Sequence, residues 1–129
     1  YDEMVLNVDV TPTILKLAGL DIPARYQGAS LTSFYQGRPK NWRNAIFCEH
    51  RLEGNPLLLK TECYRDDTWK FIRYEDHPTY YELYNVKKDI NETHNLAFDK
   101  KYKDRVGFFA QQCDSAAAKL MSQRVSPLH

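Results

Sequence analysis

The chain has 129 residues, which is enough for one small domain or for one domain with an appendage. Hydrophobic residues make up 43% of it, and nine tyrosines, six phenylalanines and two tryptophans supply large side chains for a core. The net charge of +1, from 18 basic and 17 acidic residues, argues against a nucleic-acid partner. No apolar run approaches the ~20 residues that span a bilayer, so we expect no membrane partner either.

The first predicted element is a short amphipathic helix over residues 10–18. Asp9 or Thr11 can cap its N-terminus through a side-chain oxygen. Pro12 is tolerated in the first turn, where its missing N–H would have no acceptor within the helix. Gly19 is placed to end the helix.

A connector over residues 21–41 follows, with a short helical turn predicted around Leu31, Phe34 and Tyr35. The pattern then changes to strand-length apolar or alternating runs. Strands are predicted over residues 45–48, 57–65, 68–74 and 80–86, with turns at 66–67 and 75–79. In the third run, Trp69, Phe71 and Arg73 alternate with Lys70, Ile72 and Tyr74. These runs predict an antiparallel meander of about four strands.

A long helix is predicted over residues 101–121, followed by a frayed tail. Its apolar stripe consists of Tyr102, Val106, Phe109, Cys113, Ala116 and Leu120. Such a stripe is typical of a helix packed on a sheet. The fold class expected is therefore α+β: a small antiparallel sheet of about four strands packed against a long C-terminal helix, preceded by a short helix and a connector. Residues 1–43 and residues 44–129 are the two predicted regions.

A self-contained active site is not visible in the sequence. There is no GxSxG, GxxxxGK[ST], GxGxxG or HExxH string, and the four histidines are widely spaced. The three cysteines, Cys48, Cys63 and Cys113, cannot all pair within one chain and lack a close CxxC spacing. We interpret them as buried free thiols. We predict neither catalytic nor metal-ligating residues in this chain.

Five strings, in order, resemble the C-terminal region of type I sulfatases of the alkaline-phosphatase-like superfamily. They are VLNVDVTPTILKLAG at residues 5–19, QGASL at 27–31, WRNAIFCE at 42–49, KTECYR followed by WKFIRY within 60–74, and ELYN with later Asp89, Glu92 and NLA within 82–97. The match has departures: Ala29 stands where the family commonly has Arg, Asn85 where it has Asp, and Ile90 where it has Pro.

The resemblance implies a C-terminal fragment of a sulfuric ester hydrolase, which acts on sulfated carbohydrate in the family. A formylglycine made from Cys or Ser in a C/S-x-P-x-R motif attacks sulfur there, with calcium as cofactor. No such motif occurs in this chain. We therefore expect no cofactor in it, and we expect the chain by itself to be inactive, with the nucleophile and calcium ligands in a separate catalytic core.

The same resemblance implies that this part covers the core and forms a rim of the substrate pocket. The connector from Cys48 to Arg65 is the candidate rim, because polar side chains gather there at strand ends. The substrate-rim candidates are Glu49, His50, Arg51, Lys60, Glu62 and Arg65.

Two alternatives remain open: a piece of a related phosphodiesterase or phosphonate hydrolase, and a stand-alone interaction module. The partners implied by the family are the catalytic core and a sulfated sugar. Loss of the core would leave an apolar surface through which copies of the chain self-associate. The family resemblance also implies a periplasmic, secreted or lysosomal location.

Overall fold

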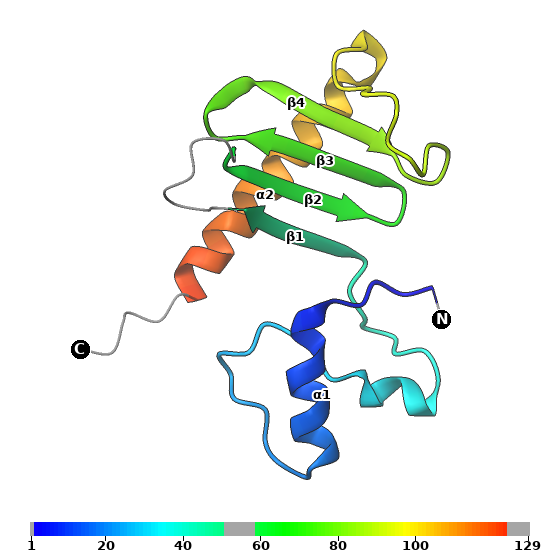
Figure 1. The fold of residues 1–129 in the computed structure, drawn as a ribbon, viewed down its shortest axis with the longest axis vertical. Coiled ribbons are helices and arrows are strands. Elements are labelled where there is room, and N and C mark those ends of the chain that lie inside the picture. The colour runs from blue at the N-terminus through cyan, green and yellow to red at the C-terminus, as the bar shows by residue number, and fades with distance from the viewer. Residues whose placement is uncertain (1, 51–58, 124–129) are drawn as a thin grey trace, which may run out of the picture. The chain divides into compact units, whose positions relative to one another are not determined.

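The computed structural model describes residues 2–50 and 59–123. The chain divides into two compact units, an N-terminal unit over Tyr1–Asn44 and a C-terminal unit over Ala45–His129. Figure 1 shows the order of the elements in each unit. No helix within the described ranges is long and apolar enough to cross a bilayer.

Over its described residues, 2–44, the N-terminal unit contains two short 3₁₀ helices and one α-helix. Their bounds are Asn7–Asp9 for η1, Val10–Leu17 for α1 and Leu31–Gln36 for η2. The prediction of a short helix is thus confirmed, and η2 coincides with the predicted helical turn. Gly19 ends α1 with a φ of +73°, which favours glycine. The amide of Gly19 donates to the Lys16 carbonyl and that of Leu20 to the Leu15 carbonyl, so the last turn closes as a Schellman motif.

The prediction that a side-chain oxygen caps the N-terminus of α1 was wrong. Asp9 does occupy the N-cap position, but its carboxylate makes no capping hydrogen bond. It accepts instead from the amides of Leu6 and Ala29 and from the guanidinium of Arg43. The reason is that these partners, two of them distant along the chain, take up both carboxylate oxygens. The hydroxyl of Thr13 donates to the backbone carbonyl of Asp9.

The C-terminal unit is a four-stranded antiparallel sheet with one long helix, as predicted (Figure 1). The strand order is β1-β2-β3-β4. The bounds are Ala45–His50 for β1, Thr61–Asp66 for β2, Trp69–Tyr74 for β3 and His77–Asn85 for β4. Residues 57 and 58 of the second predicted strand lie outside the described residues.

One turn was predicted too long. Residues 75–79 were expected to form it, yet β4 already begins at His77, which pairs with Tyr74 next to a register shift. Pro78 cannot donate a ladder hydrogen bond, but β4 lies at the edge of the sheet, where such a residue is tolerated. Proline and its polar neighbours therefore indicated a turn where an edge strand begins.

The core lies between the sheet and α2, which spans Lys103–Gln123 after the 3₁₀ helix η3 at Lys100–Tyr102. Its fully buried members are Phe71, Leu83, Phe109 and Cys113. Phe71 and Phe109 stack with ring centroids 6.3 Å apart. Side chains of a strand alternate between the two faces of the sheet. The other odd-numbered residues of β3 therefore face the helix as Phe71 does, and the even-numbered residues face away.

Candidate functional site

Four of the predicted rim residues gather at one end of the β1–β2 pair. His50 ends β1 and pairs with Thr61, the first residue of β2, so Lys60 lies beside it. The next pair along is Glu49 with Glu62. Arg51 falls outside the described residues. The pairing therefore brings together the strand ends on which these four polar residues lie.

The remaining candidate, Arg65, does not join them. It pairs with Ile46 at the other end of β2. It lies four residues after Thr61, a distance of roughly 13 Å at ~3.3 Å per residue. The side chains also divide between faces: Glu62 lies in register with Arg73 on the helix side, whereas odd-numbered β2 residues point away. One continuous site does not form from all the predicted residues.

Glu62 is held in an ion-pair network that the sequence did not predict. Its side chain is only 6% exposed, and its carboxylate accepts from Arg73 Nε at 2.6 Å. Arg73 Nη1 also donates to Asp114 on α2 at 2.6 Å. Burial would lower the pKa of Arg73, but its hydrogen bonds to Asp114 and Glu62 raise that pKa above its ordinary value. Arg73 thus ties β3 to β2 through Glu62 and to α2 through Asp114, and Glu62 has a structural role in this network.

The N-terminal unit contains a second buried ionic cluster. Asp9 is fully buried and forms a bidentate ion pair with Arg43. The Arg43 guanidinium also donates to the Met4 carbonyl. The indole nitrogen of Trp42 donates to the same carbonyl. The Arg43 guanidinium carbon lies over the Trp42 ring, 4.7 Å from the ring centroid. The cluster therefore joins the N-terminal segment, the start of α1, the Ala29 loop and the end of the connector.

The charge state of this cluster follows from its partners. Burial would raise the pKa of the Asp9 carboxyl, but the hydrogen bond from Arg43 and those from the amides of Ala29 and Leu6 outweigh it, so the pKa lies below its ordinary value of 3.8. Asp9 is accordingly ionised at neutral pH, and all its acceptor capacity is directed at groups of the fold. It is a structural anion with no free oxygen for a ligand.

The described residues do not fit a calcium site. Across residues 2–50 and 59–123, no group of three or more His, Cys, Asp or Glu side chains is arranged to hold a metal ion. The two buried carboxylates, Asp9 and Glu62, are engaged by arginines. We therefore derive no chemical step through calcium or formylglycine from this chain.

An apolar surface is exposed on the N-terminal unit. Along α1, Val10, Ile14 and Leu17 recur at spacings of four and three residues, and their exposed fractions are 51%, 59% and 61%. Val5, Val8 and Leu20 are also exposed in the same unit. A stripe at this spacing is the face that an amphipathic helix normally buries. We call Val10, Ile14 and Leu17 the α1 stripe.

The family model for the C-terminal region of N-sulphoglucosamine sulphohydrolase matches residues 1–119. The chain belongs to this sulfatase C-terminal family. The fold agrees: the structure of a 2-O glycosaminoglycan sulfatase superposes with a TM-score of 0.76 at 28% identity, covering 86% of this chain and 24% of that one. Membership confirms the resemblance drawn from the five strings.

Two further relatives of this family member differ in their named activities. The N-acetylglucosamine-6-O-sulfatase of Bacteroides thetaiotaomicron is 28% identical over 101 residues, or 75% of this chain. A phosphonate monoester hydrolase of Agrobacterium radiobacter has a TM-score of 0.69 at 25% identity, with 86% of this chain and 24% of that one covered. The chain spans only 18% and 21% of the length of two curated sulfatases that it matches.

Proposed function

We propose that the protein carrying this chain is a sulfuric ester hydrolase that acts on a sulfated carbohydrate, and that this chain is its C-terminal subdomain. The family match over residues 1–119 carries this proposal. Relatives named for N-acetylglucosamine-6-O-sulfate and for glycosaminoglycans support a sulfated amino sugar or its polymer as the substrate class. The catalytic core would supply the formylglycine and the calcium site of the family.

The direct test is hydrolysis by the full protein. Inorganic sulfate release should be measured from N-acetylglucosamine-6-sulfate, glucosamine-N-sulfate and 4-nitrophenyl sulfate. Phenyl phosphonate monoesters should be tested beside them, because the similarity to a phosphonate monoester hydrolase favours that activity as the second candidate. A protein that cleaves phosphonate monoesters but no sulfate would replace the first proposal with the second.

The chain contributes two things to this function. The α1 stripe supplies an apolar surface that packs on the catalytic core. At the β1–β2 end, His50 and Lys60 supply a cationic or hydrogen-bonding rim, which suits an anionic sugar. His50 is exposed and Lys60 is half-buried, and by strand alternation they lie on opposite faces of this end of the sheet, so a ligand would meet both only at the strand ends. Replacing both by alanine should raise KM for a sulfated oligosaccharide more than for 4-nitrophenyl sulfate, as steady-state kinetics would show.

Packing of the α1 stripe on the core predicts a stability effect that this chain alone would not show. Leu17→Ala in the full protein should lower the free energy of unfolding by about 2 kcal/mol, the low end for a buried leucine. If Leu17 stayed as exposed as it is here, the change would be within ~0.5 kcal/mol. Urea denaturation measures the difference. Ile90→Ala, at a loop position 83% exposed, is the matched control with little expected change.

We also propose an extracytoplasmic location, periplasmic, secreted or lysosomal, on the strength of the family alone. Fractionation of cells producing the full protein, with immunodetection of each fraction, tests it. Recovery with cytoplasmic markers would overturn this part without affecting the proposed activity.

A further inference from the structure

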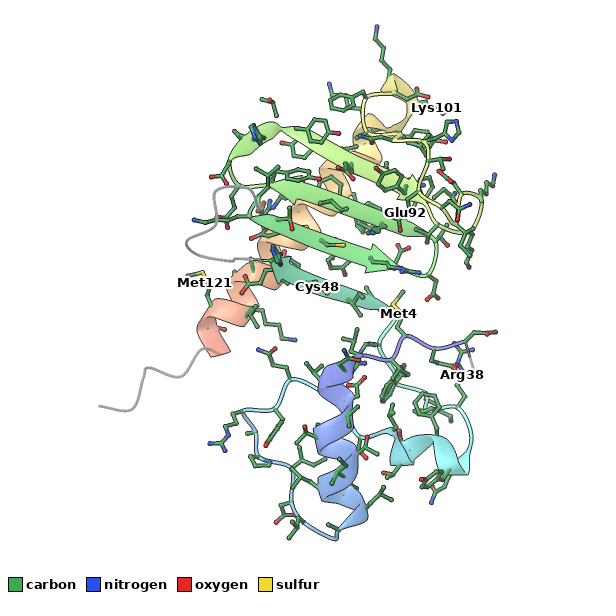
Figure 2. All side chains as sticks on the ribbon, viewed as in Figure 1. Met4, Arg38, Cys48, Glu92, Lys101 and Met121 are labelled. Carbon is green, nitrogen blue, oxygen red and sulfur yellow. The ribbon has the colours of Figure 1, made fainter. Side chains whose placement is uncertain are left out.

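Two of the three cysteines are direct neighbours across two strands. Cys48 of β1 pairs with Cys63 of β2 in the antiparallel register, and both thiols are free. Figure 2 shows Cys48 on β1, which the strand order places at the edge of the sheet. Tyr64, the next residue along β2, belongs to the residues packed on the helix-side core. Cys63 therefore points to the opposite face, and Cys48 shares that face with it.

The backbone pattern identifies the type of pair. The amide of Glu75 donates to the carbonyl of Lys60 at 3.0 Å, which continues the β2–β3 ladder. Even-numbered residues of β2 thus direct their backbone groups to β3, and odd-numbered residues direct theirs to β1. Cys63 and Cys48 are accordingly a hydrogen-bonded pair, whose Cα atoms lie about 5.5 Å apart. Disulfides most often join Cα atoms ~5.5–6 Å apart.

The Cβ separation sets the cost of joining them. Opposed Cβ atoms are roughly 4.5–5.5 Å apart, with hydrogen-bonded pairs such as this one at the wide end, whereas a disulfide needs ~3.5–4.5 Å. A shift of about 1 Å closes the gap, and β1 can make it because a single neighbouring strand holds this edge strand. The Cys48 thiol is also close enough to raise the pKa of Cys63, although burial is the larger cause.

Cys113 cannot take the place of either partner. It lies on α2 and is fully buried against Phe71, Leu83 and Phe109. The sheet itself therefore separates its thiol from the face that bears the other two. Burial raises the pKa of Cys113 to about 12, which keeps it a neutral thiol. The fold thus selects one cysteine pair from three candidates.

We infer that Cys48 and Cys63 form an oxidisable dithiol that closes to a disulfide and ties the edge strand β1 to β2. The reaction needs an external disulfide as the oxidant, such as oxidised glutathione. The Cys48 thiolate attacks one sulfur of that disulfide, forms a mixed disulfide and releases one thiol. The Cys63 thiolate then attacks the Cys48 sulfur and releases the second thiol. Two electrons pass to the oxidant, and the two protons leave the protein thiols for the released ones.

The accessibility of the two thiols determines their order. Cys48 is exposed and meets the oxidant first. Burial raises the pKa of Cys63 to about 11, so Cys63 reacts poorly with an oxidant in solution, and it is its position opposite Cys48 that lets it resolve the mixed disulfide. The closing shift leaves the bond strained, and we expect it to open again at a moderate excess of reduced glutathione.

The test uses the full native protein in glutathione buffers of graded redox ratio, followed by alkylation and peptide mass spectrometry. At excess oxidised glutathione, the peptides carrying Cys48 and Cys63 should appear joined and about 2 Da lighter than their sum. Cys63→Ala should instead accumulate a glutathione adduct on Cys48, because no resolving thiol remains. Cys48→Ser should abolish both products.

Cys113→Ala is the matched control and should leave the joined peptides at their wild-type yield. A wild-type protein that accumulates the glutathione adduct without joining Cys48 to Cys63 would overturn the inference. So would native protein in which neither thiol reacts, while urea-unfolded protein reacts at both.

Discussion

Replacing Gly28 by alanine should destabilise the N-terminal unit by at least about 3 kcal/mol, the upper end for overpacking. A Cβ built at this position would lie 2.0 Å from the Val8 carbonyl oxygen, 2.5 Å from its carbon and 2.9 Å from the Asp9 nitrogen. All three are backbone atoms, so no side chain can rotate away, and the loop must move. The adjacent amide of Ala29 donates to the Asp9 carboxylate at 2.8 Å and would move with it.

Urea denaturation and amide hydrogen exchange of the full protein measure this effect. The Ala29 amide should lose protection even where the sheet of the C-terminal unit stays protected, because the clash is local. Gly107→Ala is the matched control. Gly107 lies within α2, and apart from its own helix backbone no atom of the described residues lies within 4 Å of an added Cβ, so the change should stabilise by about 0.5–1 kcal/mol. Wild-type protection of Ala29 in the Gly28→Ala protein would contradict the clash.

The local sequence pattern predicted the strands and the helix of the C-terminal unit well, because each of these elements is determined by residues close together in the chain. The alternation over residues 69–74 assigns Trp69 and Phe71 to the packed face, and both contact the core there. The stripe on the long helix likewise contains Phe109 and Cys113, which are fully buried. Period and side-chain size suffice for such assignments, since each depends on a few neighbouring residues.

The residues that join distant segments could not be assigned in this way. Asp9 has the features of a helix cap, and its true partner Arg43 is 34 residues away. Glu62 has the features of a surface charge at a strand end, but Arg73 across the sheet buries it. Such pairs depend on the strand register and on the path of the connector, neither of which a local pattern contains.

The prediction that all cysteines are buried was also wrong for Cys48, which is exposed. Phe47, the preceding residue of β1, packs on the core, so Cys48 points to the face of the sheet opposite α2. The register that places Cys48 opposite Cys63 belongs to the pairing of β1 with β2, so it emerged only with the structure.

Arg43→Ala should destabilise the N-terminal unit by about 3–5 kcal/mol at neutral pH, the usual cost of leaving a buried charge without its partner. Asp9 stays fully buried in this variant and, among the described residues, keeps the hydrogen bonds from the Leu6 and Ala29 amides but loses its counter-charge. The destabilisation by Arg43→Lys should lie between zero and that of Arg43→Ala, because an ammonium keeps the charge but cannot make the two parallel hydrogen bonds of the guanidinium. Lys101→Ala, which removes a solvent-exposed ion pair with Asp99, should give no measurable change.

The pH dependence distinguishes lost charge pairing from lost packing. In the wild type the pKa of Asp9 lies below 3.8, so its contribution is fully present above that value and is lost as pH falls towards the folded pKa. Without Arg43, burial should bring the pKa of Asp9 above its unfolded value. Lowering the pH should therefore raise the free energy of unfolding of the variant, because Asp9 becomes neutral, while it lowers that of the wild type. The two unfolding free energies should therefore converge between pH 7 and pH 3, as urea titrations would show. A gap that stays constant over this range would mean that Arg43 acts through its packing on Trp42 rather than through the charge of Asp9.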